Sequence, residues 1–361
     1  MILNNLILAV VASFFASLLA APFVKKLAIK INAMDKPNAR KVHQKLMPRM
    51  GGLSIVIGFG VGLLILQPQS PYLPALLMGA LVIIIVGILD DIHTLSPIMK
   101  LIGQVVAAVI VVSSGLTIDK FTLPFSGPIY LEMWSYPVTI LWIVGITNAI
   151  NLIDGLDGLA AGVSAIAMSS ILIMAVMHNQ ILVIMLCAIM ISSTLGFLPY
   201  NFYPAKIFMG DTGALFLGYI ISVISMLGLF KNVTLFSFVI PIIILAIPIF
   251  DTFFAIIRRI LNRQSISEPD KQHLHYRLLG FGFNHKTTVL IIYSISLCFG
   301  ISAILFSKST LWASFIIIGL LLILIQLGAE FIGLIGQNHK PIINTFRKLN
   351  DGKKLISDKD K

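Results

Sequence analysis

Residues 72–91 read YLPALLMGALVIIIVGILDD, an apolar run that two adjacent carboxylates end. A run of about 18 or more apolar residues is long enough to cross the hydrocarbon core of a bilayer as a helix. Comparable runs recur along the chain of 361 residues, which has a mean hydropathy of +0.98, with 58% apolar and 11% charged residues. Ordinary soluble domains carry roughly 25% charged residues. This composition excludes a soluble globule and predicts an all-α polytopic membrane protein.

Eleven apolar windows of this kind are bounded by polar or Gly/Pro-rich breaks. They lie near residues 4–24, 50–67, 72–89, 98–115, 137–150, 158–176, 181–199, 212–230, 234–257, 287–306 and 310–335. The first window lacks a basic segment before it and is followed by Lys25-Lys26, which favours an uncleaved anchor over a signal peptide. We therefore expect about eleven transmembrane helices in one integral membrane domain, residues 1–336, followed by a basic cytoplasmic tail, residues 337–361.

The positive charges divide unevenly between the two sides of the predicted membrane. Alternation of eleven spans puts 23 of the 26 Lys and Arg residues in the tail and in loops after odd-numbered spans. The other three are Lys120, Lys231 and Lys308. Cytoplasmic loops carry an excess of Lys and Arg, so the N-terminus is expected outside and the C-terminus in the cytoplasm. The net charge of +11 then faces anionic lipid headgroups, and no nucleic-acid partner is expected.

Outside the membrane, the longest segment covers residues 116–136, alternates partly between apolar and polar residues, and turns between Pro124 and Pro128. This pattern is typical of a β-hairpin, and we expect a small one on the outer interface. The two cysteines, Cys187 and Cys298, lie inside apolar runs, so no disulfide framework is expected.

The strongest chemical signal is the segment NAINLIDGLDG, residues 148–158. Its four polar side chains are spaced by three residues: Asn148, Asn151, Asp154 and Asp157. On a helix this spacing gives a slanting stripe at the end of a span. Amides and carboxylates flanked by Ile and Leu are costly near lipid unless they serve a site, although an ordinary polar helix end is the alternative. An EF-hand fits poorly, because Ala165 stands where the bidentate Glu belongs.

The acidic pair Asp90-Asp91 ends its apolar run at a low-dielectric boundary. Neighbouring like charges in such a place raise one pKa unless a cation compensates. The pair therefore implies a metal ion, a Lys or Arg partner, or a catalytic proton. An equally good interpretation is that the two carboxylates only mark the point where the span leaves the membrane and enters water.

A third motif precedes the apolar run 214–227. Asp211 and Thr212 stand where the N-cap of a helix belongs. A helix N-terminus beside a carboxylate suits a metal-bound phosphate, whereas a plain N-cap is the simpler alternative. Phe208 lies three residues before Asp211 and is placed to stack on a base.

Two basic loops complete the predicted site. The loop after the ninth window contains a compact cationic cluster: Lys271, His273, His275 and Arg277. Such a cluster suits phosphate oxygens, and zinc is disfavoured because no cysteine or His-x-x-x-His pattern accompanies the histidines. The first cytoplasmic loop, residues 35–52, adds Lys45 as a candidate substrate contact and ends in Gly51-Gly52, which lets backbone approach a ligand.

The predicted topology brings these groups to one face. Six carboxylates fall at cytoplasmic ends of spans: Asp90, Asp91, Asp154, Asp157, Asp211 and Asp251. The last of them lies in a window that Pro241 and Pro248 are expected to bend. Carboxylates for Mg²⁺, cations for phosphate and a helix N-terminus for an anion are the parts of a phosphoryl-transfer site.

These motifs resemble, in order and over roughly residues 1–335, those of the polyprenyl-phosphate N-acetylhexosamine-1-phosphate transferases. The resemblance implies a Mg²⁺-dependent enzyme at the cytoplasmic face of a bacterial membrane. Such an enzyme joins a UDP-amino sugar to undecaprenyl phosphate and releases UMP. The branch that starts teichoic acid chains is the most similar, which implies N-acetylglucosamine as the sugar, undecaprenyl-diphosphate-N-acetylglucosamine as the product and a first step toward wall teichoic acid. The resemblance leaves a homodimer open.

The resemblance also implies roles for single residues. Asp211 corresponds to the Mg²⁺ ligand, and Asp90 to the group that readies the lipid phosphate, with Asp91 beside it. Phe208 corresponds to the residue that stacks on uracil. The other substrate-binding positions are Asn148, Asn151, Asp154, Asp157, Asn201, His273, His275 and Arg277. Direct attack by the lipid phosphate and a phospho-enzyme on Asp90 both stay open, and direct attack is favoured because the lipid phosphate is already a competent nucleophile.

Other classes fit less well. The peptidoglycan-type branch, which transfers phospho-N-acetylmuramoyl-pentapeptide, has three consecutive histidines and a lysine after the acidic pair, where this chain has Leu274 and Thr94. Tyr276 replaces a histidine common in teichoic-acid-type relatives, and its role stays open. A membrane transporter would place its site near the bilayer midplane within repeated halves, and the sequence shows neither feature. A purely structural anchor would not retain so many polar groups at span ends.

Overall fold

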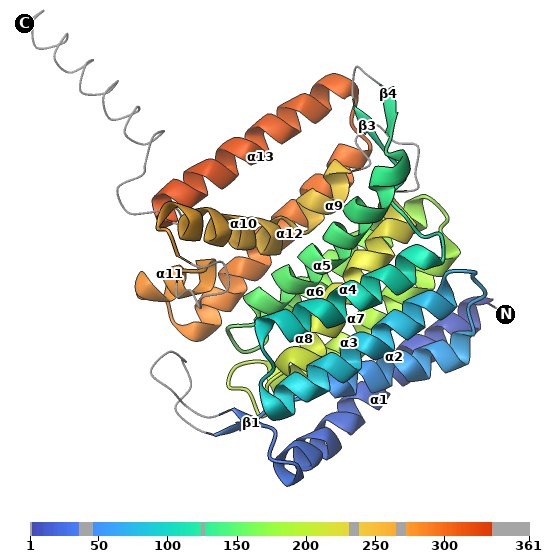
Figure 1. Cartoon of the computed structure of the whole chain (residues 1–361), viewed down its shortest axis with the longest axis vertical. Helices are drawn as coiled ribbons and strands as arrows, with labels where there is room; N and C mark the ends of the chain where they lie inside the picture. The colour runs from blue at the N-terminus through green and yellow to red at the C-terminus, as the bar shows by residue number, and fades with distance from the viewer. Residues whose placement is uncertain (1, 36–45, 124–126, 231–237, 265–271, 334–361) are drawn as a thin grey trace, which may run out of the picture.

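The computed structural model describes residues 2–35, 46–123, 127–230, 238–264 and 272–333. Its α-helices are α1 (Ile2–Lys30), α2 (Gly52–Leu66), α3 (Leu73–His93), α4 (Pro97–Ser113), α5 (Ser135–Ile153), α6 (Leu159–Met177), α7 (Ile181–Asn201), α8 (Gly210–Ser225), α9 (Val239–Ile244), α10 (Ala246–Leu261), α11 (Leu274–Gly280), α12 (His285–Ser307) and α13 (Leu311–Ile332). Two short antiparallel pairs accompany them: β1 (Met34–Asp35) with β2 (Met47–Pro48), and β3 (Lys120–Leu123) with β4 (Gly127–Tyr130). Figure 1 places β1 at one end of the helical bundle and the β3–β4 hairpin at the opposite end.

Among the described residues, eight helical segments are long and apolar enough to cross a membrane. They contain α1, α3, α5, α6, α7, α8, α12 and α13. Helices α2 and α4 are also apolar but have only 15 and 17 residues. The protein is therefore an all-helical, multi-pass membrane protein, as expected. The count of eleven spans and the orientation stay predictions.

The window expected near residues 234–257 is not one continuous helix. It forms α9 and α10, which are separated at Leu245. Pro248 has no N–H to donate to the carbonyl four residues earlier, and its ring crowds that carbonyl. The bend expected from the prolines in this window is thereby confirmed, with the start of the window outside the described residues.

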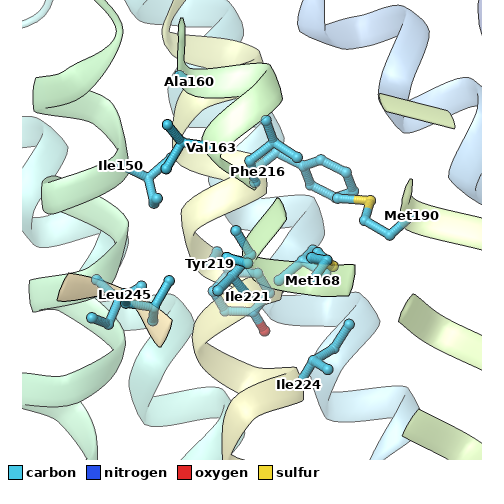
Figure 2. Close-up of a cluster of buried hydrophobic side chains, with 14 of the residues drawn as sticks. Ile150, Ala160, Val163, Met168, Met190, Phe216, Tyr219, Ile221, Ile224 and Leu245 are labelled. Carbon is cyan, nitrogen blue, oxygen red and sulfur yellow. The ribbon is translucent and has the colours of Figure 1, made fainter. Parts of the chain in front are cut away.

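Helix α8 lies at the centre of the bundle. Nearly all of its side chains are buried, and its apolar residues pack with those of α5, α6 and α7 (Figure 2). The Tyr219 hydroxyl donates to the Leu76 carbonyl at 3.0 Å and so joins α8 to α3. Glycines permit the closest approaches, since a Cβ on Gly218 would lie 2.7 Å from the Thr147 Cα of α5. A buried α8 fixes the positions of the residues at its N-terminus.

A short turn joins α3 to α4 beside that N-terminus. Helix α3 ends at His93, and Thr94 takes a left-handed conformation with φ of 50°. The Ser96 hydroxyl then accepts from the Met99 N–H and caps α4, with Pro97 as the first helical residue. Because the turn is short, the first turn of α4 folds back beside the last turn of α3.

The expected small hairpin is present. Strands β3 and β4 pair from Lys120 opposite Tyr130 to Leu123 opposite Gly127. Its location outside the cell stays a prediction. Both cysteines are free: Cys187 is buried and Cys298 is exposed.

Candidate active site

Three carboxylates meet where α3 ends and α8 begins. Asp90 and Asp91 are buried in the last turn of α3, and Asp211 is partly exposed in the first turn of α8. One oxygen from each carboxylate lies within 4.8 Å of the others, so this group could hold a metal ion. The structure thus brings together the acidic pair and the aspartate that are 120 residues apart in the sequence.

The Asp91 side chain caps α8. Its Oδ1 accepts from the Asp211 N–H at 2.9 Å, and its Oδ2 accepts from the Thr212 N–H at 3.1 Å and the Thr212 hydroxyl at 2.6 Å. The expectation that Asp211 is itself the N-cap is wrong, because α8 begins at Gly210 and Asp211 lies inside the first turn. Gly210 has φ of 72°, and a Cβ there would lie 2.5 Å from Asp91 Oδ2. Asp91 therefore orients Asp211, and two backbone donors at the start of α8, those of Asp211 and Thr212, are already used.

Lys100 stands between the other two carboxylates. Its Nζ lies 2.7 Å from Asp211 Oδ2 and 3.4 Å from Asp90 Oδ1, and the Leu95 N–H donates to the same Asp90 oxygen at 2.8 Å. One of the three readings of the acidic pair was a Lys or Arg partner, and Lys100 is such a partner. In the sequence, Lys100 is only one of the 23 Lys and Arg residues expected on the cytoplasmic side. The signal that finds it is the Ser96-Pro97 helix start, which puts Lys100 one turn into α4.

A second cation, Arg49, also acts on the group. Burial alone would lower the pKa of Arg49, but the carboxylates of Asp35, Asp91, Asp211 and Asp90 raise it above its usual value. The Arg49 Nε lies 3.5 Å from Asp35 Oδ1, next to the β1–β2 pair. Two cations therefore offset the negative charge of the three carboxylates: Lys100 on α4 and Arg49 in the segment before α2.

The predicted stripe of amides and carboxylates is divided between two structures. Helix α5 ends at Ile153 and α6 begins at Leu159, so Asp157 lies in a loop rather than on the helix face. Gly158, the residue before α6, has φ of 76°, a left-handed conformation outside the helical range. The stripe expected over four positions is thus a helical stripe only for Asn148 and Asn151.

The members of this segment have different partners. Asn148 and Gln104 exchange amide hydrogen bonds between α5 and α4. Asp157 Oδ2 accepts from the Ala205 N–H at 2.9 Å. Asn201 Oδ1 accepts from the Gly158 N–H at 3.2 Å, and its Nδ2 donates to the Ile207 carbonyl at 3.2 Å. These three side chains hold neighbouring protein segments together.

Asn151 and Asp154 are half-buried at the end of α5. Burial, together with the nearby carboxylates of Asp211 and Asp91, raises the pKa of Asp154 to about 8. Asp154 is therefore close enough to the three-carboxylate group to sense its charge.

The two predicted histidines lie at the start of α11. His273 Nδ1 is 2.9 Å from Asp251 Oδ2, and the Leu274 N–H donates to Asp251 Oδ1 at 2.8 Å. The His273 and His275 rings are nearly parallel, with centroids 6.0 Å apart. Asp251 thus fixes both the ring of His273 and the first turn of α11. The sequence predicted only that Asp251 is one of the carboxylates at the cytoplasmic ends of spans.

His275 is buried, and burial favours its neutral ring over the cation expected from the sequence. Burial lowers the pKa of His275 to about 4. Its Nε2 is buried without a hydrogen-bond partner, and a Cβ on Gly155 would lie 2.3 Å from that nitrogen. Arg277 donates from Nη2 to Gln272 Oε1 at 2.6 Å, and Lys271 lies outside the described residues.

The Gly51-Gly52 pair approaches protein backbone rather than a ligand. The Gly51 N–H donates to the Phe208 carbonyl at 2.9 Å, and the Gly52 N–H donates to the Met209 carbonyl at 2.8 Å. A Cβ on Gly51 would lie 2.6 Å from the Phe208 carbonyl oxygen. This pairing holds the half-buried Phe208 beside the N-terminus of α8, while Lys45 lies outside the described residues.

The helices and the carboxylate group together define a multi-pass membrane protein with a site that could hold a metal ion. Comparison with known proteins agrees with this class of protein and identifies the family within it. The chain belongs to glycosyl transferase family 4, whose sequence model matches residues 73–229, the segment that contains all three carboxylates and the loop between α5 and α6.

Named relatives share most of the chain. A probable undecaprenyl-phosphate N-acetylglucosaminyl 1-phosphate transferase of Bacillus subtilis is 53% identical over 96% of this chain and 97% of its own length. A decaprenyl-phosphate N-acetylglucosaminephosphotransferase of Mycobacterium tuberculosis is 35% identical, covering 75% of this chain and 74% of its own. An undecaprenyl-phosphate alpha-N-acetylglucosaminyl 1-phosphate transferase of Escherichia coli is 30% identical over 75% of both chains.

Proposed function

We propose that this protein transfers N-acetylglucosamine 1-phosphate from UDP-N-acetylglucosamine to undecaprenyl phosphate. The products are undecaprenyl-diphosphate-N-acetylglucosamine and UMP, and the reaction starts a cell-wall polymer, wall teichoic acid. The observation that carries the proposal is the 53% identity, over nearly the whole length, with the Bacillus subtilis protein that is named for this transferase activity. The three-carboxylate group on α3 and α8 supports the same chemistry.

The donor set fits Mg²⁺. Lys100 and Arg49 supply two positive charges against three carboxylates, and Asp154 adds a fourth negative group when ionised. Hard carboxylate oxygens are the ligands that Mg²⁺ prefers. Asp211 would hold the ion, because both Asp91 oxygens already accept hydrogen bonds from α8 and Asp90 acts on the acceptor. When bound, Mg²⁺ would neutralise charge on the diphosphate of the donor and orient it for in-line displacement.

The residues on α3, α4 and α8 prepare the acceptor. Asp90 readies the lipid phosphate by taking its proton at Oδ2, the oxygen that does not accept from the Leu95 N–H. Lys100 fixes the positions of Asp90 and Asp211 by contacting both. Direct attack of the lipid phosphate on the sugar-linked phosphate then needs no covalent enzyme intermediate, because both substrates are held at one site.

The donor binds across the loops at the same end of the bundle. Asn151 and Asp154 contact the nucleotide sugar, Phe208 stacks on uracil, and a second set of residues contacts the pyrophosphate: Lys45, His273, His275 and Arg277. Neutral His275 offers an unpaired Nε2 to that ligand. Asn148, Asp157 and Asn201, whose side chains already bond to protein, shape the surrounding loops.

The proposed placement follows the charge asymmetry. Residues 1–336 form one catalytic membrane domain with eleven spans, the tail from residue 337 is cytoplasmic, and the site faces the cytoplasm, where UDP-sugars are found. The 23 Lys and Arg residues on that side support this orientation.

UMP release tests the proposal. Purified protein is incubated with undecaprenyl phosphate, UDP-N-acetylglucosamine and Mg²⁺, and each component is omitted in turn. We expect UMP only when all three are present, and none after EDTA treatment until Mg²⁺ is restored. A stoichiometric burst of UMP without lipid would indicate a phospho-enzyme mechanism instead of direct attack. No release of UMP under any condition would overturn the proposed function.

A further inference from the structure

His285, the first residue of α12, contacts the loop between α5 and α6 from outside the predicted site. The Asp157 N–H donates to His285 Nε2 at 2.9 Å. The His285 ring stacks on Tyr203, with ring centroids 4.4 Å apart and an angle of 27° between the planes. Neither His285 nor Tyr203 has a role in the chemistry proposed above.

The same loop is held on its other sides. The Tyr293 hydroxyl of α12 donates to the Gly158 carbonyl, and the Gly158 N–H donates to Asn201 Oδ1 of α7. The Asp157 side chain accepts from the Ala205 N–H. Helix α12 therefore holds the backbone of two consecutive loop residues, and it does so at the point where α6 begins.

The hydrogen bond from Asp157 requires a particular state of His285. Because Nε2 accepts, the ring must be neutral with its proton on Nδ1. A partly buried backbone N–H that loses its acceptor is costly, so the loop would move if this acceptor were removed. Asp154 lies in that loop and Asn151 on the turn before it, whereas Asp90, Lys100 and Asp211 lie on other helices.

We propose that His285 is a positioning residue, which holds the 154–158 loop in the conformation that binds the nucleotide through the hydrogen bond from Asp157. This inference rests on the proposed function, since it concerns the donor subsite of that reaction. A loop fixed before binding loses less conformational entropy when the nucleotide binds. Removal of the acceptor should therefore weaken nucleotide binding and leave the chemical step nearly unchanged.

Two substitutions separate the acceptor from the ring. His285→Gln keeps an acceptor oxygen in reach of the Asp157 N–H but removes the ring that stacks on Tyr203. His285→Phe keeps a stacked ring but removes the acceptor. Lys286→Gln is the matched control, because Lys286 is the exposed neighbour on the same helix. Thermal unfolding in detergent identifies variants that retain the fold.

Two readouts are measured on the full chain: UDP affinity by calorimetry with Mg²⁺ present, and kcat and KM for UMP release. We expect His285→Phe to weaken UDP binding and raise KM about tenfold, with kcat within twofold of wild type. His285→Gln and Lys286→Gln should stay within about threefold of wild type in both readouts.

The converse pattern, with Phe tolerated and Gln impaired, would assign His285 to ring packing and overturn the inference. Equal values for all variants, equal impairment of Gln and Phe, or a loss confined to kcat would also overturn it. Wild-type protein that binds UDP but releases no UMP would contradict the proposed function alone. The ratio of UDP affinities among the variants would still test the role of His285.

Discussion

At the candidate site, the three carboxylates have different partners, and these partners determine the role of each aspartate. Lys100 contacts Asp211 at 2.7 Å and Asp90 at 3.4 Å, while Asp91 is bonded to the N-terminus of α8. Two aspartates that are adjacent in sequence therefore have different tasks. Asp90 faces the cation and the proposed substrate, and Asp91 orients Asp211.

Replacement of Lys100 tests the first task. Lys100→Met removes the charge between two carboxylates but keeps an apolar stem of similar length, so the carboxylates repel each other and lose their orientation. We expect kcat to fall roughly 100-fold, as for loss of other site charges and donors. Lys100→Arg keeps the charge and should stay within about tenfold of wild type. Equal rates of UMP release for the two variants would contradict this role.

The two aspartates of the α8 cap should separate function from stability. Asp211→Asn leaves its backbone N–H on Asp91, so we expect an unchanged thermal midpoint and loss of nearly all turnover, because an amide is a poorer Mg²⁺ ligand. Asp91→Asn replaces one of the two accepting oxygens with a donor and should cost about 1–3 kcal/mol of stability. Retention of more than a few per cent of activity by Asp211→Asn would remove Asp211 from the metal role.

At the scale of whole elements, helix contacts made through glycine bring the site residues together. A Cβ on Gly52 of α2 would lie 1.9 Å from the Gly213 Cα of α8, and a Cβ on Gly87 of α3 would lie 2.4 Å from the Thr212 Cα. These contacts hold three helix ends around the three carboxylates. They involve backbone on both sides, so no side chain can move aside.

A matched pair of glycines on α2 tests this packing. Gly52→Ala forces the ends of α2 and α8 apart and should lower stability by about 1–3 kcal/mol or more, with loss of activity because Asp211 shifts. Gly60→Ala meets nothing within 4 Å and should be neutral or slightly stabilising. Thermal unfolding in detergent and UMP release check both variants. Similar behaviour of the two would contradict a packing role for Gly52.

The helices and the acidic motifs could be predicted from the sequence, whereas most contacts between them could not. Apolar length predicted most of the helices, and Pro241 and Pro248 predicted a bend in the window that forms α9 and α10. The cap on α8 was misassigned because Asp91 is distant in sequence, and a cap is normally sought within a few residues of the helix start. His285 and Lys100 were missed for the same reason, since each meets its partner only after helices pack.

In the molecule as a whole, the helix ends that carry the candidate site lie at one end of the bundle. The end of α3 and the starts of α4 and α8 join through the contacts of Lys100 with Asp90 and Asp211. The end of α7 and the start of α12 both contact the loop between α5 and α6, through Asn201 and His285. Figure 1 shows the β3–β4 hairpin at the far end of the bundle. The proposed orientation puts that hairpin outside and the site in the cytoplasm.

Cysteine labelling in cells tests this orientation. Starting from a Cys298→Ala background, Lys120→Cys places a thiol at a half-buried position on the hairpin, and Lys206→Cys places one at an exposed position near the site. A membrane-impermeant maleimide should label Lys120→Cys in intact cells and Lys206→Cys only after permeabilisation. The reverse pattern would invert the topology, and labelling of both in intact cells would contradict the alternation of spans.

The most direct test of the whole account compares two donors with one acceptor. UDP-N-acetylglucosamine and UDP-N-acetylmuramoyl-pentapeptide are each given to purified protein with undecaprenyl phosphate and Mg²⁺, and kcat/KM is measured by UMP release. An enzyme that uses contacts with a bulky peptide to orient the reacting phosphate turns over the simple sugar poorly. We expect much the larger kcat/KM for UDP-N-acetylglucosamine, whereas a preference for the pentapeptide donor would contradict the proposed function.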